Sequence, residues 1–218
     1  MDSTKKAVVF LSEGFEEVEA LTPVDYLRRA GCTVITVAVP PAKTVNHPCS
    51  IDDMPSYGHI VVSSHCIPVI ADKTIDEFLA DEKELADLVF LPGGMPGSTN
   101  LAASKEVCDY VLKMSEEGKI VSAICAAPVV VLGKLGLLKG KKYTCYTGME
   151  NDAQKFCGEN YKALFEGSLH TGDVPAVKSG NIITGKGAGA AAHFALALVE
   201  ALFGEDAKKK LHERVCQF

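Results

Sequence analysis

The sequence has 218 residues, of which 47% are hydrophobic and 23% are charged, and a formal net charge of −6 at pH 7. This composition is typical of a globular protein and excludes a disordered chain. The acidic balance argues against a nucleic-acid-binding surface, because no stripe of Lys and Arg offsets it. No apolar run approaches the roughly 20 residues of a membrane-spanning helix, and the N-terminal residues show no signal-peptide pattern. We therefore expect a cytoplasmic protein.

The eight cysteines and six histidines show no metal-binding pattern. No two cysteines have the Cys-x-x-Cys spacing, and no short His/Cys spacing predicts a zinc site. In a reducing compartment the cysteines should be free thiols, most of them small buried hydrophobic residues.

The first 57 residues predict a β-α-β unit followed by an irregular insertion. Residues 7–11 and 33–39 read as strands, and residues 15–30 as a helix that Pro23 should kink or divide. A β-α-β unit implies a parallel sheet with a right-handed crossover. Residues 40–57 are polar and proline-rich without periodicity. We interpret them as an insertion in a single domain of residues 1–218.

The rest of the chain alternates strands with helices. Further strands are expected at 59–63, 67–71, 88–91, 120–124, 143–146, 175–178 and 182–184, and helices at 75–79, 104–117, 126–135, 150–156, 190–203 and 205–216. This alternation predicts an α/β sandwich around a mostly parallel sheet.

Cys125 lies at the joint between the strand 120–124 and the helix that follows. A tight strand-to-helix turn exposes its side chain above the carboxyl edge of the sheet, as in the nucleophile elbow of α/β hydrolases. The N-terminus of a helix also stabilises a thiolate, so we expect a lowered pKa for Cys125.

Two other loops should meet Cys125 at this edge, where α/β folds bind ligands. Glu16 begins the first helix and could reach across the strand ends. Gly93 and Gly94 allow close backbone approach and offer N–H groups to a negative oxygen. Each feature alone also has a structural explanation, since Glu16 suits a helix dipole, Pro-Gly-Gly suits a turn and Cys125 suits a core.

Several segments in register resemble the ThiJ/PfpI superfamily, and within it the DJ-one branch, the parkinsonism-associated deglycase family. They are residues 8–19 (VVFLSEGFEEVE), 23–25 (PVD), 28–31 (RRAG), 91–94 (LPGG), 123–128 (AICAAP), 194–197 (FALA) and 199–202 (VEAL). The resemblance implies a three-layer flavodoxin-like sandwich, similar to class I glutamine amidotransferases, and a homodimer.

The resemblance also implies roles for individual residues. Cys125 would be an oxidation-sensitive nucleophile and Glu16 its protonated partner, with anion-binding N–H groups from Gly94 and Ala126. Three further positions would belong to the pocket, namely Tyr146 in place of the family's histidine, His65 in place of an arginine that reaches the partner's site, and Ala188 in place of a loop proline.

The function implied is a cofactor-independent glyoxalase or deglycase that acts on dicarbonyls such as methylglyoxal and protects against carbonyl and oxidative stress. The alternative is a redox-sensing stress chaperone whose Cys125 is oxidised to a sulfinate. A cysteine peptidase is disfavoured, because Ala126 stands where the protease-like branch has histidine and no Cys–His pair is evident.

Overall fold

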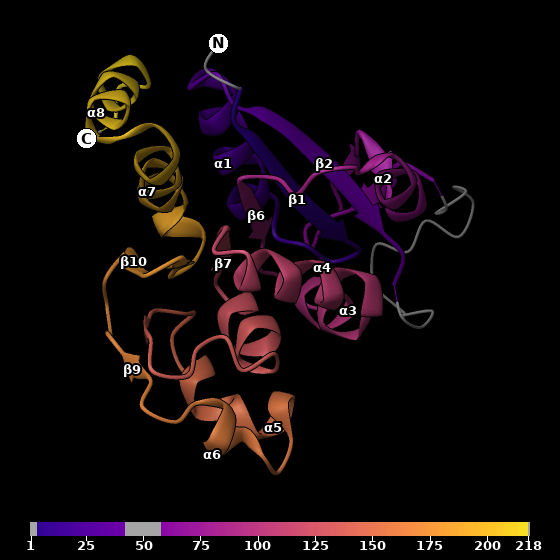
Figure 1. Ribbon diagram of the computed structural model, residues 1–218, viewed down its shortest axis with the longest axis vertical. Helices are drawn as coiled ribbons and strands as arrows, with labels where there is room; N and C mark the ends of the chain where they lie inside the picture. Colours follow the sequence, from indigo (N-terminus) through magenta and orange to yellow (C-terminus); the bar gives the residue numbers. More distant parts are fainter. Residues whose placement is uncertain (1–3, 42–57, 218) are drawn as a thin grey trace.

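A seven-stranded sheet forms the centre of the computed structural model, which describes residues 4–41 and 58–217 (Figure 1). Its strand order is β10-β11-β7-β6-β1-β2-β5, and all neighbours are parallel except the β10–β11 pair. The bounds are β1 (Lys6–Ser12), β2 (Thr33–Val39), β5 (Lys73–Thr74), β6 (Leu88–Leu91), β7 (Ile120–Ile124), β10 (Ala176–Ser179) and β11 (Ile182–Gly185). The order β2-β1-β6-β7-β11 is that of flavodoxin-like sheets. The predicted α/β fold is confirmed.

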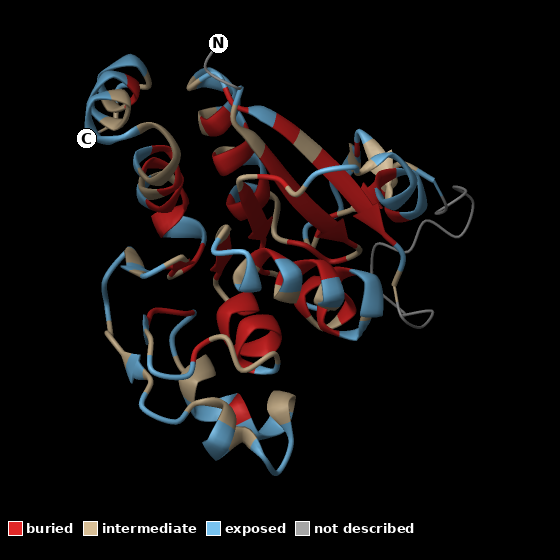
Figure 2. Ribbon diagram, viewed as in Figure 1, coloured by how far each residue is buried: buried red, intermediate tan, exposed pale blue. Residues whose placement is uncertain are grey.

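The central strands consist mostly of apolar residues, as expected for a sheet covered on both faces. In β1, Val8 and Phe10 belong to one core cluster, whereas Val9 and Leu11 belong to the other. This alternation follows the period of two of a strand. The strands are accordingly buried along most of their length (Figure 2).

Helices cover the two faces of the sheet. One core cluster contains residues of α2 (Ile75–Asp81), α3 (Gly97–Ala103), α4 (Lys105–Glu116) and the π-helical segment η1 (Pro128–Gly133). The other contains residues of α1 (Glu17–Arg29), α7 (Ala191–Phe203) and α8 (Glu205–Arg214). The sheet is therefore the middle of three layers.

The helix α1 continues through Pro23, so of the two expected outcomes, a kink or a division of the helix, the division is wrong. Proline removes one backbone hydrogen bond from a helix interior. Here Pro23 lies on the buried face with Ala20, Val24 and Leu27, and packing of that face offsets the loss.

The smaller elements lie outside the central sheet. The strands expected at 59–63 and 67–71 are confirmed as β3 (Ile60–Val62) and β4 (Pro68–Ile70), which pair as an antiparallel hairpin. The strand expected at 143–146 is only the short β8 (Lys142–Tyr143), paired with β9 (Leu169–His170). Short helical segments complete the chain, namely η2 (Met149–Asp152), α5 (Ala153–Cys157), α6 (Tyr161–Leu164) and η3 (Ala188–Ala190). Most of the predicted insertion lies outside the described residues. Among the residues described, no helix is long and apolar enough to cross a membrane.

Candidate active site

Cys125 occupies a strained turn directly after β7. Its φ of 64° lies in the left-handed region, which costs a non-glycine residue free energy and is frequent at functional sites. Backbone hydrogen bonds on both sides hold the turn, because the Cys125 N–H donates to the Gly185 carbonyl at 3.0 Å and the Tyr146 N–H donates to the Cys125 carbonyl at 2.8 Å. The structure thus places Cys125 on an elbow at the carboxyl edge of the sheet.

Glu19 is the carboxylic acid in contact with Cys125. Its side chain is buried, hydrogen-bonds the Cys125 thiol and accepts backbone hydrogen bonds from Gly93, at 3.1 Å, and from Ala188. Burial is the largest influence and raises the pKa of the Glu19 carboxyl to about 8. At neutral pH Glu19 therefore carries a proton that it can share with the sulfur.

Glu16 has a different position, and the expectation that it pairs with Cys125 is corrected. It is the N-cap of α1, and its carboxylate accepts a hydrogen bond from the Glu19 N–H at 2.6 Å. An N-cap side chain folds back onto the free N–H groups of its own helix. Glu19, three residues further on, lies on the buried side of the first turn and reaches the sulfur instead.

The backbone N–H groups of Gly94 and Ala126, the two expected donors, hydrogen-bond the sulfur of Cys125. Gly93 differs from the expectation, because its N–H donates to Glu19. Gly93 also has to lack a side chain, since a Cβ there would come within 3.0 Å of the Cys125 sulfur. Gly93 thus positions the Glu19 carboxyl, while the N–H groups of Gly94 and Ala126 face the Cys125 sulfur.

The expected lowering of the Cys125 pKa is wrong. Burial raises the pKa of the thiol, and the negative charge of ionised Glu19 raises it further, while the N–H groups of Gly94 and Ala126 act in the opposite direction. The thiol and the carboxyl interact strongly, so they titrate as a coupled pair. A thiol of raised pKa keeps its proton near neutral pH, so the neighbouring Glu19 carboxyl is the group placed to exchange that proton.

The three residues expected to complete the pocket divide into two groups. The backbone N–H of Tyr146 donates a hydrogen bond to the Cys125 carbonyl, and the backbone N–H of Ala188 donates one to the Glu19 carboxyl. His65 instead lies on the outer hairpin, where its side chain is 68% exposed and its Nδ1 pairs with Glu17 Oε1 at 2.8 Å.

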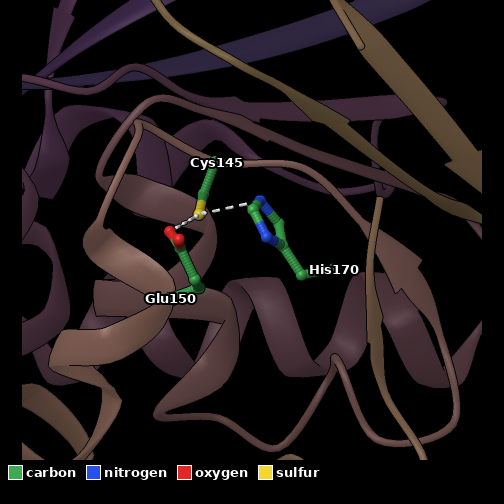
Figure 3. Close-up of side chains that lie close together, drawn as sticks. All are labelled: Cys145, Glu150 and His170. Carbon is green, nitrogen blue, oxygen red and sulfur yellow. Dashed lines mark hydrogen bonds between the residues drawn. The ribbon is translucent and has the colours of Figure 1, made fainter. Parts of the chain in front are cut away.

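The structure also brings together residues that the sequence spacing did not connect. Cys145, Glu150 and His170 converge, and potential ligand atoms from all three lie within 4.8 Å of one another (Figure 3). No spacing signal predicts this cluster, because His170 lies in β9, which pairs with β8 but is separated from it in the sequence by η2, α5 and α6.

The cysteines are not uniformly free thiols, contrary to the expectation. Cys66 is disulfide-bonded. The free thiols among the described residues are Cys32, Cys108, Cys125, Cys145, Cys157 and Cys216.

Comparison with known proteins gives a consistent family match. The model of the DJ-1/PfpI family matches residues 5–201. The protein dj-1beta of Drosophila melanogaster is 32% identical over 203 residues, which cover 93% of this chain and 92% of the relative. A DJ-1 superfamily protein of Salmonella typhimurium, solved as a mutant, superposes with a TM-score of 0.77 at 37% identity and covers 97% of this chain and 98% of its own.

Two further relatives bear on size and activity. The DJ-1 homolog B of Arabidopsis thaliana is 31% identical over 94% of this chain, but the chain spans only 40% of its length. A protein of Caenorhabditis elegans named glutathione-independent glyoxalase DJR-1.2 is 27% identical, with coverage of 99% of this chain and 98% of the relative.

Proposed function

The chain belongs to the DJ-1/PfpI family, and we propose that it is a glutathione-independent glyoxalase that converts dicarbonyls such as methylglyoxal into 2-hydroxy acids. The observation that carries this proposal is the buried contact between Cys125 and Glu19, with two N–H groups directed at the sulfur. A thiol, a carboxyl of raised pKa and an anion-binding pair are the groups that the isomerisation of an aldehyde requires.

The reaction begins with addition of the sulfur to the aldehyde carbon. The Cys125 thiol gives its proton to the Glu19 carboxylate as the C–S bond forms, and the carbonyl π electrons move to the aldehyde oxygen. The N–H groups of Gly94 and Ala126 stabilise this oxyanion, and Glu19 returns the proton to it. The product is a hemithioacetal, with Glu19 again a carboxylate.

Glu19 then moves a proton between the two carbons. As a base it removes the hydrogen from the carbon that carries sulfur, which leaves an enediolate, and as an acid it delivers this proton to the neighbouring carbon. The hydroxyl proton passes to the second oxygen, so the intermediate becomes a thioester of the 2-hydroxy acid. Water hydrolyses the thioester and releases lactate and the thiol, so the net change is addition of one water molecule without any redox co-reactant.

The name of the C. elegans relative supports this activity. A deglycase activity on glycated amino or thiol groups would use the same nucleophile and acid, and we include it in the proposal. A peptidase is not proposed, because Glu19 rather than an imidazole contacts the Cys125 sulfur.

The test is lactate formation from methylglyoxal in the absence of glutathione. The wild type should produce lactate, and Cys125→Ser should produce none above the uncatalysed rate. Cys108→Ser removes another partly buried thiol and should match the wild type. Equal rates in all three proteins would refute the proposal.

The second candidate function is redox sensing with stress protection. The N–H groups around the sulfur and the proton of Glu19 are suited to hold a sulfinate at Cys125. Mild peroxide should then add two oxygens to Cys125 first, as measured by peptide mass analysis. Earlier oxidation of another cysteine, such as the exposed Cys216, would contradict it.

Homodimer formation and a cytoplasmic location complete the proposal. Val18 and Leu21 are exposed apolar residues on α1, and Ile67 and Ile70 are exposed on the hairpin beside it. Backbone hydrogen bonds join the hairpin to the start of α1, since Ser64 N–H donates to the Phe15 carbonyl at 2.7 Å. Leu21→Glu should halve the mass measured by light scattering, and cell fractionation tests the location.

A further inference from the structure

Three potential metal ligands converge beside the active-site elbow without taking part in its chemistry. Cys145 follows β8, Glu150 lies in η2 and His170 lies in β9. The Cys145 sulfur is 3.8 Å from Glu150 Oε2 and 3.8 Å from His170 Nε2 (Figure 3). One donor atom from each residue lies within 4.8 Å of the other two.

These separations are close to those of a metal site. With Zn–S near 2.3 Å and Zn–N or Zn–O near 2.1 Å, the donors of a tetrahedral zinc site lie roughly 3.4 to 3.6 Å apart. The two distances from the sulfur need to shorten by only a few tenths of an ångström. The third pair, at no more than 4.8 Å, has to close by at most about 1.4 Å.

The arrangement differs from that of a second nucleophile. In a catalytic triad the imidazole contacts the thiol, and the carboxylate contacts the imidazole. Here the carboxylate and the imidazole both contact the sulfur, and no ion pair joins Glu150 to His170, two residues that the structure describes. Cys145 has no exposed surface, whereas Glu150 and His170 are half-buried, so solvent reaches the ligands but the sulfur cannot attack a substrate.

The donor set has the chemistry of a zinc-class ion. Thiolate, imidazole and carboxylate are the three ligand types that zinc binds in proteins. Binding replaces the S–H bond of Cys145 with a metal–sulfur bond and releases one proton to solvent. The two negative charges then on Cys145 and Glu150 balance a divalent cation, and three protein ligands leave a fourth position for water.

We propose that Cys145, Glu150 and His170 bind a divalent transition-metal ion of the zinc class at a site separate from the Cys125 pocket. The ion supports the active site indirectly. Tyr146, the residue after Cys145, holds the carbonyl of Cys125 through its backbone N–H, and the metal ties this segment to β9. Its effect is on the stability of the segment and not on the reaction itself.

Cobalt titration of the full-length, chelator-treated protein tests the site. One equivalent of Co²⁺ should produce a thiolate-to-cobalt charge-transfer band, tetrahedral d–d bands and release of one proton, and Zn²⁺ should displace it. Cys145→Ser should lose the charge-transfer band. His170→Gln and Glu150→Gln should weaken Co²⁺ binding by more than the 10- to 100-fold typical of a lost supporting group.

The control variants separate this site from the others. Cys157→Ser removes a half-buried thiol that donates a hydrogen bond to the Val129 carbonyl at 3.5 Å. This variant should leave the charge-transfer band and the affinity for Co²⁺ unchanged, and so should Cys125→Ser. A band that persists in Cys145→Ser, a band lost in Cys125→Ser, or no binding to the wild type would each overturn the proposal. If circular dichroism shows that Cys145→Ser is unfolded, His170→Gln decides the question, and unchanged affinity in that variant overturns the site.

Discussion

The Glu16 carboxylate accepts a hydrogen bond of 2.6 Å from the backbone N–H of Glu19. One acid therefore caps the helix that presents the other acid to Cys125. The cap fixes where α1 begins, and the first turn then places Glu19 on the buried side, against the sulfur and the Gly93 N–H. The two glutamates have separate roles, one in folding and one in chemistry.

Substitution of the two acids should separate these roles. Glu19→Gln removes the group that moves protons, so kcat/KM for methylglyoxal should fall by about 10² to 10⁴. Glu16→Gln keeps an oxygen that can cap the helix, so it should cost at most about 1 kcal/mol of stability and leave kcat/KM within about threefold. Lactate assays and thermal melts of both variants make the comparison. Equal losses of activity would contradict the assignment of Glu19.

The pH dependence of kcat/KM should follow the ionisation of the Glu19 carboxyl that contacts Cys125. Because burial raises the pKa of Glu19 to about 8, the carboxylate that accepts the thiol proton is scarce at pH 6.5 and abundant at pH 9. We expect kcat/KM to rise with pH through a midpoint near 8. Residual activity of Glu19→Gln should lack this step. A flat profile in the wild type would show that the pair does not control the reaction.

The stability of the folded protein should decrease as pH rises, whereas its activity should increase. Between the unperturbed pKa of 4.5 and the folded pKa of about 8, the folded protein holds a proton on Glu19 that the unfolded chain has lost. The free energy of unfolding should therefore fall as pH rises through this window, by up to about 5 kcal/mol from this group. Denaturant titrations of the wild type and Glu19→Gln from pH 5 to about pH 9 measure the slope. The variant should lose most of this decline, and identical slopes would exclude Glu19 as its source.

Gly93→Ala should disrupt the pair by crowding. A Cβ at Gly93 would contact the Glu19 carboxylate and the Cys125 side chain, and overpacking of this kind typically costs about 1 to 3 kcal/mol. We expect a lower melting temperature and a loss of lactate formation of at least about tenfold. Gly189→Ala is the matched control, because a Cβ there meets nothing within 4 Å. If both variants kept full activity, close packing at Gly93 would not matter to the site.

Much of the fold could be predicted because local patterns decide it. The strands β2, β6 and β7 begin and end where their apolar runs predict, since strands buried on both faces are continuously hydrophobic. The position of Cys125 followed from the same pattern, as it is the first residue after such a run. The short elements α3, α6 and β9 were missed because they are set by packing and loop closure rather than by periodicity.

The sequence by itself determined the sheet, the elbow and the family resemblance, because each depends on short continuous segments whose patterns can be recognised without the fold. Only the tertiary structure decided which acid meets the thiol, because Glu16 and Glu19 are one helical turn apart and the choice depends on where α1 begins and how it lies on the sheet. It also decided that burial raises the pKa of Cys125, and that the side chains of Cys145, Glu150 and His170 lie close together. Desolvation and contacts between distant segments are properties of the packed chain and have no local sequence signal.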